Sequence, residues 1–202
     1  MKLFFAPGAC SLSPHIALRE AGLDFELVQV DLRTKKTKTG EDFTTINPKG
    51  MVPTLQLDNG DTLTEGPAIV QYIGDQNLDS RIVPKPGTME RYHLMELLNF
   101  ITSEMHKGYS PLFNSAVPEE YKVMARAALS KRYDHVDGIL AGYPFLMGEH
   151  FTVADGYLFT VTNWARIVKF DLTPWKNVAT FMDRIRARPH VQEALKAEGI
   201  LK

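Results

Sequence analysis

The sequence predicts an α+β protein whose first part contains a mixed sheet and whose second part is all helical. Up to residue 77, short runs with the alternation of strands are interspersed with helical patterns. From residue 91 onward, apolar residues recur only at helical spacing. The stretch between these parts is broken by two prolines and a glycine. We therefore expect a sheet-containing domain over residues 1–77, a linker over residues 78–90 and a helical domain over residues 91–202.

The first three elements indicate a parallel pair of strands. Lys2–Phe5 is predicted as a short apolar strand ended by a Pro-Gly turn, and Phe25–Val30 as the second strand. The helix between them can be capped by Ser11 or Ser13 and stops at Gly22. A strand, a helix and a strand in this order form a parallel pair with a right-handed crossover.

A hairpin and a helix complete the first domain. Thr54–Leu57 and Thr62–Thr64 are predicted as strands joined by the turn sequence Asp-Asn-Gly-Asp. Glu41–Ile46 can form a short helix before the hairpin, and an apolar helix opens after it at Glu65. The order βαβ followed by ββα is that of a thioredoxin-like fold, in which the parallel pair and the hairpin share one four-stranded sheet.

The second domain is predicted to contain about five helices. They are expected over the ranges Arg91–His106, Glu119–Leu140, Thr152–Val168, Pro174–Arg188 and His190–Ala197. The third begins with Thr152-Val-Ala-Asp155, which has the spacing of a capping box with aspartate in place of glutamate. Asp155 is therefore expected to cap its helix from inside the core.

The composition excludes several classes of function. The 23 basic and 24 acidic residues give a formal net charge of -1, which predicts no binding to nucleic acid or to a membrane surface. No apolar run approaches the roughly 20 residues of a membrane-spanning helix, and the N-terminus lacks the pattern of a signal peptide. The single cysteine excludes an internal disulfide and fits a reducing cytoplasm, so we expect a cytoplasmic protein.

The stretch Asn47–Leu57 holds the first candidate binding feature. Pro53 leads into a strand although proline cannot donate to a strand ladder. One explanation is a cis peptide bond after Val52, which leaves the Val52 backbone groups free to pair with an extended peptide ligand. Glu65 and a helix N-terminus lie close in sequence. This combination suits a ligand with both an ammonium and a carboxylate group, although Glu65 can equally be an ordinary first-turn acid.

Cys10 is the first candidate for chemistry. It lies in the turn before the first helix, whose N-terminus would stabilise a thiolate. The spacing Cys10-Ser-Leu-Ser13 lacks the second cysteine of a dithiol oxidoreductase. Such a site can form a mixed disulfide with a small thiol but has no resolving cysteine in the chain. The alternative is a buried cysteine that acts as a small apolar residue.

A polar stripe on the first helix of the second domain is a further candidate. Asn99, Ser103 and His106 fall at i, i+4 and i+7 and so line one face. One interpretation is that the stripe faces a cleft, where His106 would stabilise a thiolate or donate a hydrogen bond. The commoner alternative is that this face of the helix is exposed to solvent. Lys107 can hold a carboxylate or be simply exposed, and the pattern alone favours a solvated Lys35.

No other chemistry has motif support. The six histidines are scattered, and none has a ligand-like spacing to cysteine, so no metal site is expected. The sequence contains neither a phosphate-binding loop nor the Gly-x-Ser-x-Gly motif of serine hydrolases.

Four motifs gain specificity when they are taken together. They are Lys2–His15 (KLFFAPGACSLSPH), Asn47–Pro53 (NPKGMVP), Leu63–Ile69 (LTEGPAI) and Phe151–Asp155 (FTVAD). In combination they resemble the bacterial beta-class cytosolic glutathione transferases over essentially the whole chain. The resemblance implies a thioredoxin-like N-terminal domain, an all-helical C-terminal domain, a homodimer and a cis Pro53.

The resemblance also implies roles for residues of the first domain. Cys10 matches the family's active-site cysteine, which contacts the glutathione sulfur or holds it in a mixed disulfide. Val52, before Pro53, matches the backbone that pairs with the cysteinyl part of glutathione. Glu65 and Gly66 match the pair that grips its γ-glutamyl end. Many relatives carry serine at the second position of this pair, so Gly66 keeps the backbone N–H but loses a hydroxyl contact.

Further positions match in the same way. Lys35 matches a basic residue near the glycyl carboxylate of glutathione, and His106 and Lys107 match residues facing its sulfur. Positions that can reach the neighbouring subunit's glutathione in family dimers are Asn99, Ser103 and Glu104. The side of the cleft that would bind the electrophile is expected to contain Tyr109, Phe113, Trp164 and Ile167.

The expected function is therefore that of a glutathione transferase. It would lower the thiol pKa of bound glutathione and add the sulfur to a small hydrophobic electrophile, with glutathione as co-substrate and no other cofactor. One alternative is glutathione-dependent reductive dehalogenation or disulfide reduction, in which Cys10 is obligatory. Another is a non-catalytic protein that binds glutathione or hydrophobic molecules.

Overall fold

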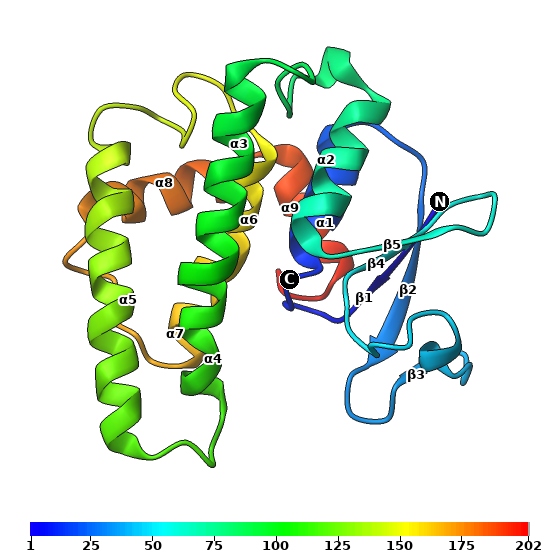
Figure 1. Ribbon diagram of the computed structural model, residues 1–202, viewed down its shortest axis with the longest axis horizontal. Coiled ribbons are helices and arrows are strands. Elements are labelled where there is room, and N and C mark those ends of the chain that lie inside the picture. The colour runs from blue at the N-terminus through cyan, green and yellow to red at the C-terminus, as the bar shows by residue number, and fades with distance from the viewer. Residues whose placement is uncertain (202) are drawn as a thin grey trace. The chain divides into compact units, whose positions relative to one another are not determined.

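The computed structural model describes residues 1–201, which fall into two units (Figure 1). Unit 1 comprises residues 1–83 and 188–201, and unit 2 comprises residues 84–187. Two boundaries differ from those expected. Ile82 and Val83, in the expected linker, are buried and belong to unit 1. The last helix, α9 (Pro189–Ala197), packs on α1 (Leu12–Glu20) and belongs to unit 1, because apolar residues such as Val191 and Leu195 are buried there.

Unit 1 contains a five-stranded mixed sheet in the order β3-β2-β1-β4-β5. Its strands are β1 (Lys2–Phe5), β2 (Glu26–Asp31), β3 (Lys36–Thr37), β4 (Thr54–Gln56) and β5 (Thr62–Thr64). The pair β1–β2 is parallel and the other pairs are antiparallel. The expected thioredoxin-like arrangement is confirmed, but the sheet has five strands and not four. The additional strand, β3, lies in a polar segment after β2 that is rich in lysine. Its two residues are too few to produce a strand pattern.

Alternating side chains of β1 supply the cores on the two faces of the sheet. Phe5 lies against His15 of α1, with ring centroids 6.3 Å apart. Phe4 points to the other face and contacts Phe43 of the 3-10 helix η1 (Phe43–Thr45), with ring centroids 5.4 Å apart. Val52 is buried in this second cluster, which also contains Ala6 and Val30. The cluster therefore anchors the loop before β4.

The turn before α1 is held by a hydroxyl group. Ser11 is the N-cap residue of α1, but its side chain does not bond the first helical turn. Its buried Oγ instead donates to the carbonyl of Ala6 and accepts from the Ala6 N–H, at 3.2 Å in each case. The Ser13 hydroxyl has no partner within residues 1–201. The predicted N-cap position of Ser11 is therefore confirmed, but its hydroxyl closes the turn that carries Cys10 and does not bond the helix.

The remaining elements of unit 1 follow the hairpin. They are α2 (Gly66–Gln76) and the 3-10 helix η2 (Leu78–Ser80). α2 packs on α1 and buries Ile69, Val70 and Ile73. The N-terminus of α2 directly follows Glu65, as the sequence predicted.

Unit 2 is all helical. Its elements are α3 (Met89–Phe100), the π-helix η3 (Ile101–His106), α4 (Lys107–Phe113), α5 (Glu119–Leu140), α6 (Val153–Thr162), α7 (Trp164–Ile167) and α8 (Lys176–Arg186). The first predicted helix therefore continues to Phe113 through a π turn, and the third divides at Asn163. Of the helices between residues 1 and 201, none combines the length and the apolar character needed to cross a membrane.

The capping box of α6 is present as predicted. The Asp155 carboxylate accepts the Thr152 N–H at 2.7 Å and the Thr152 hydroxyl at 3.0 Å. It also accepts the Leu146 N–H at 2.8 Å, which ties the preceding loop to the helix. Every residue of α6 is buried. Asp155 is thus structural, and it fixes a helix that carries Tyr157.

Candidate active site

Cys10 and the Val52 backbone meet in unit 1. Cys10 directly precedes Ser11, the N-cap residue of α1, and its Sγ donates to the Val52 carbonyl at 3.3 Å. The peptide bond between Val52 and Pro53 is cis, which confirms the expectation. The fold therefore brings together a thiol and a backbone edge that are 42 residues apart in sequence.

Asn47 organises the loop that ends at Pro53. Its buried side chain donates from Nδ2 to the Met51 carbonyl and to the Thr54 hydroxyl, each at 2.9 Å. Its Oδ1 accepts the Lys49 N–H at 3.1 Å. This role of Asn47 was not predicted, although asparagine before Pro-Lys-Gly is a strong signal for a side chain that bonds its own turn. Asn47 shapes this loop by satisfying its backbone groups.

Lys35 turns toward the same loop. Its Nζ donates to the Gly50 carbonyl at 2.9 Å. Its φ of 58° places it in the left-handed region, which is uncommon for a residue other than glycine. The pattern-only interpretation of Lys35 as a freely solvated lysine is wrong, because the turn after β2 directs its ammonium group onto the loop.

Glu65 is paired with Lys49, a residue for which no role was predicted. Its Oε1 lies 2.7 Å from Lys49 Nζ, which also donates to the Thr64 hydroxyl at 3.0 Å. Glu65 has a φ of 70° and precedes Gly66, the first residue of α2. A cation that binds Glu65 therefore competes with Lys49 for the carboxylate. Nothing in the spacing of Lys49 and Glu65 predicted their contact, because it depends on the loop conformation.

A buried carboxylate ties the Cys10 turn to the end of α9. Glu198 accepts the Gly8 N–H at 2.9 Å through Oε2 and lies 2.8 Å from His15 Nδ1 through Oε1. Arg19 Nε donates to His15 Nε2 at 2.9 Å. The side chains of His15 and Glu198 are fully buried. Sequence reasoning missed this network because its members lie at opposite ends of the chain.

The unit 2 candidates centre on His106, the last residue of the π-helix. Its Nδ1 lies 2.7 Å from the Tyr157 hydroxyl. Its ring packs edge to face against Trp164, with centroids 4.8 Å apart. Burial lowers the pKa of His106 to about 4, with a smaller contribution from the charge of Lys107. His106 is therefore neutral at neutral pH.

Tyr109 does not line a cleft, and this prediction is wrong. Its side chain is fully buried, and its hydroxyl lies 2.7 Å from that of Tyr133, which donates to the Thr162 hydroxyl at 3.1 Å. Burial raises the pKa of the Tyr109 hydroxyl far above its usual range. The phase of α4, set by the preceding π turn, directs Tyr109 into the core of unit 2.

The other predicted electrophile contacts differ in exposure. Phe113 and Ile167 are exposed, whereas Trp164 is buried. Phe113 packs on Trp164 with ring centroids 5.7 Å apart. An apolar group made of Phe113 and Trp164 therefore adjoins His106, and Ile167 follows on the short helix α7.

The predicted polar stripe is only partly continuous. Asn99 and Ser103 are exposed, and their side chains donate to carbonyls four residues earlier at 2.8 and 3.0 Å. Glu104 forms an ion pair with Arg132 of α5, with Oε2 at 2.7 Å from Nε. His106 turns inward, because the π turn changes the angular spacing between residues. Lys107 is exposed.

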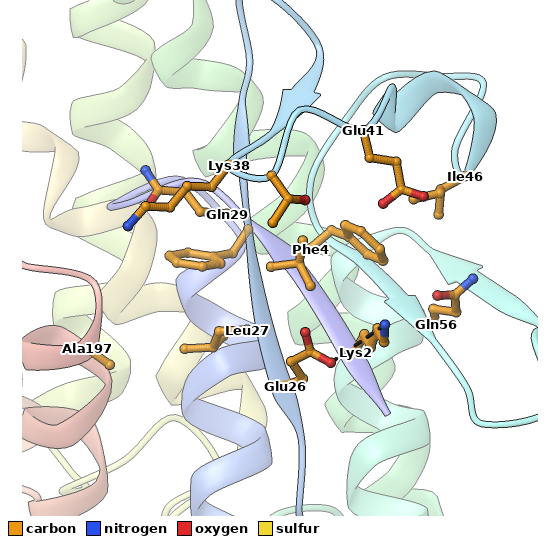
Figure 2. Close-up of a pocket in the computed structure, with 13 residues that line it drawn as sticks. Lys2, Phe4, Glu26, Leu27, Gln29, Lys38, Glu41, Ile46, Gln56 and Ala197 are labelled. Carbon is orange, nitrogen blue, oxygen red and sulfur yellow. Dashed lines mark ion pairs between the residues drawn. The ribbon is translucent and has the colours of Figure 1, made fainter.

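Unit 1 also has a hollow of about 490 Å³ at the outer side of β2 (Figure 2). Phe4, Val28 and Ile46 contribute apolar walls, and Lys2 and Glu26 form an ion pair at its rim, with Nζ and Oε2 3.6 Å apart. None of the predicted site residues lines it. Between residues 1 and 201, no three histidine, cysteine or acidic side chains are arranged to hold a metal ion.

Comparisons with known proteins agree on one family. The N-terminal domain model of glutathione S-transferases matches residues 8–76, and the C-terminal domain model matches residues 100–189. The glutathione S-transferase GstA of Escherichia coli O157:H7 is 49% identical over 200 residues, which cover 99% of this chain and 100% of GstA.

Two solved structures extend the likeness to the fold. A sphingomonad glutathione S-transferase complexed with glutathione is 48% identical, with a TM-score of 0.95 over 99% of this chain and 100% of that one. The bacterial beta-class glutathione S-transferase of Sphingomonas chungbukensis is also 48% identical, with a TM-score of 0.96 over the full length of both chains.

Proposed function

The chain belongs to the glutathione S-transferase family, and from this premise we propose that it conjugates the sulfur of reduced glutathione to small hydrophobic electrophiles. The observation that carries the proposal is the convergence of groups on the Asn47–Pro53 loop. The Cys10 thiol and the Lys35 ammonium both bond carbonyls of this loop, and Lys49 within it holds Glu65. A tripeptide with charged ends and a central thiol matches this set of groups.

Glutathione would be held in unit 1 by its backbone and both of its ends. The Val52 backbone before Pro53 would pair with the cysteinyl residue, as an added strand does. Glu65 would bind the γ-glutamyl ammonium, and the N–H of Gly66 at the start of α2 would bind the adjacent carboxylate. Lys35 would bind the glycyl carboxylate.

Unit 2 would supply the groups that act on the sulfur and the electrophile. We assign His106 and Lys107 to the sulfur, and Phe113, Trp164 and Ile167 to the electrophile. The chain would form a homodimer, in which the residues that reach the neighbouring subunit's glutathione are Asn99, Ser103 and Glu104. Glu104 would have to exchange its ion pair with Arg132 for this contact. Glutathione would be the only co-substrate, with no bound cofactor, and the site of action would be the cytoplasm.

Cys10 would serve a separate redox task. Its thiolate would attack oxidised glutathione to form a mixed disulfide and release one reduced glutathione. The donation of the Cys10 thiol to the Val52 carbonyl supports a place for Cys10 beside the bound ligand. Conjugation would therefore survive its replacement.

The test measures glutathione-dependent thioether formation with an activated aryl halide. Wild type, Cys10→Ala and Glu65→Gln are compared. We expect turnover in wild type, most of that rate in Cys10→Ala, and a raised KM for glutathione in Glu65→Gln. Loss of all activity in Cys10→Ala would instead favour glutathione-dependent disulfide reduction or reductive dehalogenation as the function. Glutathione binding by wild type without turnover would favour the non-catalytic alternative.

A further inference from the structure

The contact between His106 and Tyr157 contains one proton whose position decides what His106 can do. The 2.7 Å separation of His106 Nδ1 and the Tyr157 hydroxyl is that of a hydrogen bond. Either the hydroxyl donates to Nδ1 and the ring carries its proton on Nε2, or Nδ1–H donates to the hydroxyl and Nε2 is bare. In the first case Nε2 of His106 can donate a hydrogen bond. In the second case Nε2 can act as a base.

Chemistry favours donation by Tyr157. A phenol is a good donor and a weak acceptor, because its oxygen lone pair is delocalised into the ring, whereas the bare nitrogen of imidazole is a good acceptor. The neighbouring Thr102 hydroxyl donates to the Leu98 carbonyl at 2.7 Å and lies 3.4 Å from the Tyr157 oxygen. Burial, which lowers the pKa of His106, keeps the ring neutral, so only one of its nitrogens carries a proton.

The surrounding elements hold this pair in one geometry. Tyr157 lies on α6, which is buried throughout and fixed by its capping box. The His106 ring packs edge to face against both Tyr157 and Trp164, with centroids 6.0 and 4.8 Å away. Within residues 1–201, Nε2 of His106 has no hydrogen-bond partner, so it is the nitrogen available to a ligand.

We propose that Tyr157 is a positioning residue whose hydroxyl holds His106 in the Nε2–H tautomer, so that His106 donates a hydrogen bond to the reacting sulfur and does not act as its base. The role toward the sulfur rests on the proposed conjugation of glutathione. The assignment of the tautomer does not, because it follows from unit 2 alone.

The first test observes the tautomer directly. Protein labelled with ¹⁵N in its six histidines is studied by long-range ¹H–¹⁵N correlation at pH 7.5, with His106 assigned from His106→Gln. We expect a protonated Nε2 and a hydrogen-bonded, unprotonated Nδ1 in wild type. In Tyr157→Phe the Nδ1 signal should move to the position of an unbonded nitrogen. Tyr133→Phe is the control, because it removes another buried hydroxyl of unit 2 that does not contact His106.

A protonated Nδ1 in wild type overturns the proposal, as does an unchanged Nδ1 signal in Tyr157→Phe. The second test is a double-mutant cycle on kcat with glutathione and an aryl halide. In the wild-type background, Tyr157→Phe should lower kcat about three- to tenfold, which corresponds to the free energy of one hydrogen bond. In the His106→Gln background, the same substitution should lower kcat by less than about twofold. An equal loss in both backgrounds shows that Tyr157 does not act through His106.

The two proposals fail separately. If wild type does not turn over the halide, the proposed conjugation fails, and the NMR result still decides the tautomer.

Discussion

At the scale of single residues, two of the predicted glutathione contacts in unit 1, Glu65 and Lys35, are already bonded to other groups of the protein. Lys49 holds Glu65, and Lys35 holds the Gly50 carbonyl. Both Lys49 and Glu65 are well exposed, so their ion pair is weak and can be exchanged for a ligand ammonium at little cost. Gly66 differs from these residues, because it has no side chain to bond a ligand and leaves open space where a side chain would lie.

The first prediction concerns a substitution that fills the space beside Gly66. A Cβ added at Gly66 would have no atom within 4 Å, and its φ is not in the left-handed region. Gly66→Ser should therefore fold normally and add one hydroxyl hydrogen bond to the γ-glutamyl carboxylate. We expect glutathione to bind about three- to tenfold more tightly by calorimetry. Gly66→Ala is the matched control, and equal affinities of the two variants would show that no hydroxyl contact forms.

The second prediction concerns the protonation of His106. Its pKa is about 4 in the folded protein, against 6.5 for an ordinary histidine. Between these values the unfolded chain binds a proton that the folded chain does not, so the unfolded state is favoured as the pH falls. The contribution of neutral His106 to the free energy of unfolding is therefore complete above pH 6.5 and is lost as the pH approaches 4.

NMR titration of His106 should accordingly give a midpoint near 4. The free energy of unfolding should fall more steeply between pH 7 and 5 in wild type than in His106→Gln. A midpoint at the ordinary value, or parallel curves for the two proteins, would contradict the assigned burial effect.

At the scale of elements, prediction succeeded where one periodic signal dominated. α5 was predicted with its observed bounds, because it is long, begins with two acidic residues and carries a regular apolar spacing. The π turn at Ile101–His106 was missed, because a periodicity of 3.6 cannot reveal one inserted residue, and this error also misplaced Tyr109. β3 was missed because it has only two residues. Lys49 and Tyr157 were missed because their partners are set by tertiary packing.

The third prediction compares two glycines inside helices. A Cβ at Gly74 of α2 would lie 2.4 Å from Val83 Cγ1, whereas a Cβ at Gly138 of α5 would meet nothing within 4 Å. Val83 is buried and β-branched, so it cannot move aside easily. Gly74→Ala should destabilise the protein by about 1–3 kcal/mol through overpacking, and Gly138→Ala should stabilise it by up to about 1 kcal/mol through helix propensity.

Chemical unfolding followed by far-UV circular dichroism measures both variants. Tryptophan fluorescence alone does not suffice, because Trp164 and Trp175 both belong to unit 2 while Gly74 belongs to unit 1. A gain in stability from Gly74→Ala would show that α2 can shift away from Val83.

At the scale of the whole chain, the two ends of the sequence are joined inside unit 1. The network runs from Arg19 through His15 to Glu198, which also accepts the Gly8 N–H. Because Arg19 Nε can only donate, His15 Nε2 must accept and His15 Nδ1 must donate to Glu198. Both oxygens of Glu198 are therefore acceptors. One of the bonded donors, the N–H of Gly8, lies two residues before Cys10, so the C-terminal segment supports the turn that carries the thiol.

The fourth prediction tests this directional network with an isosteric change. Glu198→Gln replaces one acceptor oxygen by an NH₂ group that faces either the Gly8 N–H or the proton on His15 Nδ1. Reversal of the His15 tautomer cannot relieve the conflict, because Arg19 needs Nε2 as its acceptor. We expect a loss of about 1–3 kcal/mol in the free energy of unfolding, the cost of a buried donor without a partner. Amide exchange in α1 and α9 should also accelerate.

Glu193→Gln on the same helix is the matched control. Glu193 is half exposed and paired with Arg19 at 3.2 Å, so its replacement should change stability by less than about 1 kcal/mol. Iodoacetamide labelling of Cys10 provides a second readout, since loss of the Gly8 contact should alter the labelling rate in Glu198→Gln but not in Glu193→Gln. Equal stabilities and equal labelling rates would mean that α9 is held by its apolar contacts alone. The buried carboxylate would then have no part in placing the turn that precedes the first helix.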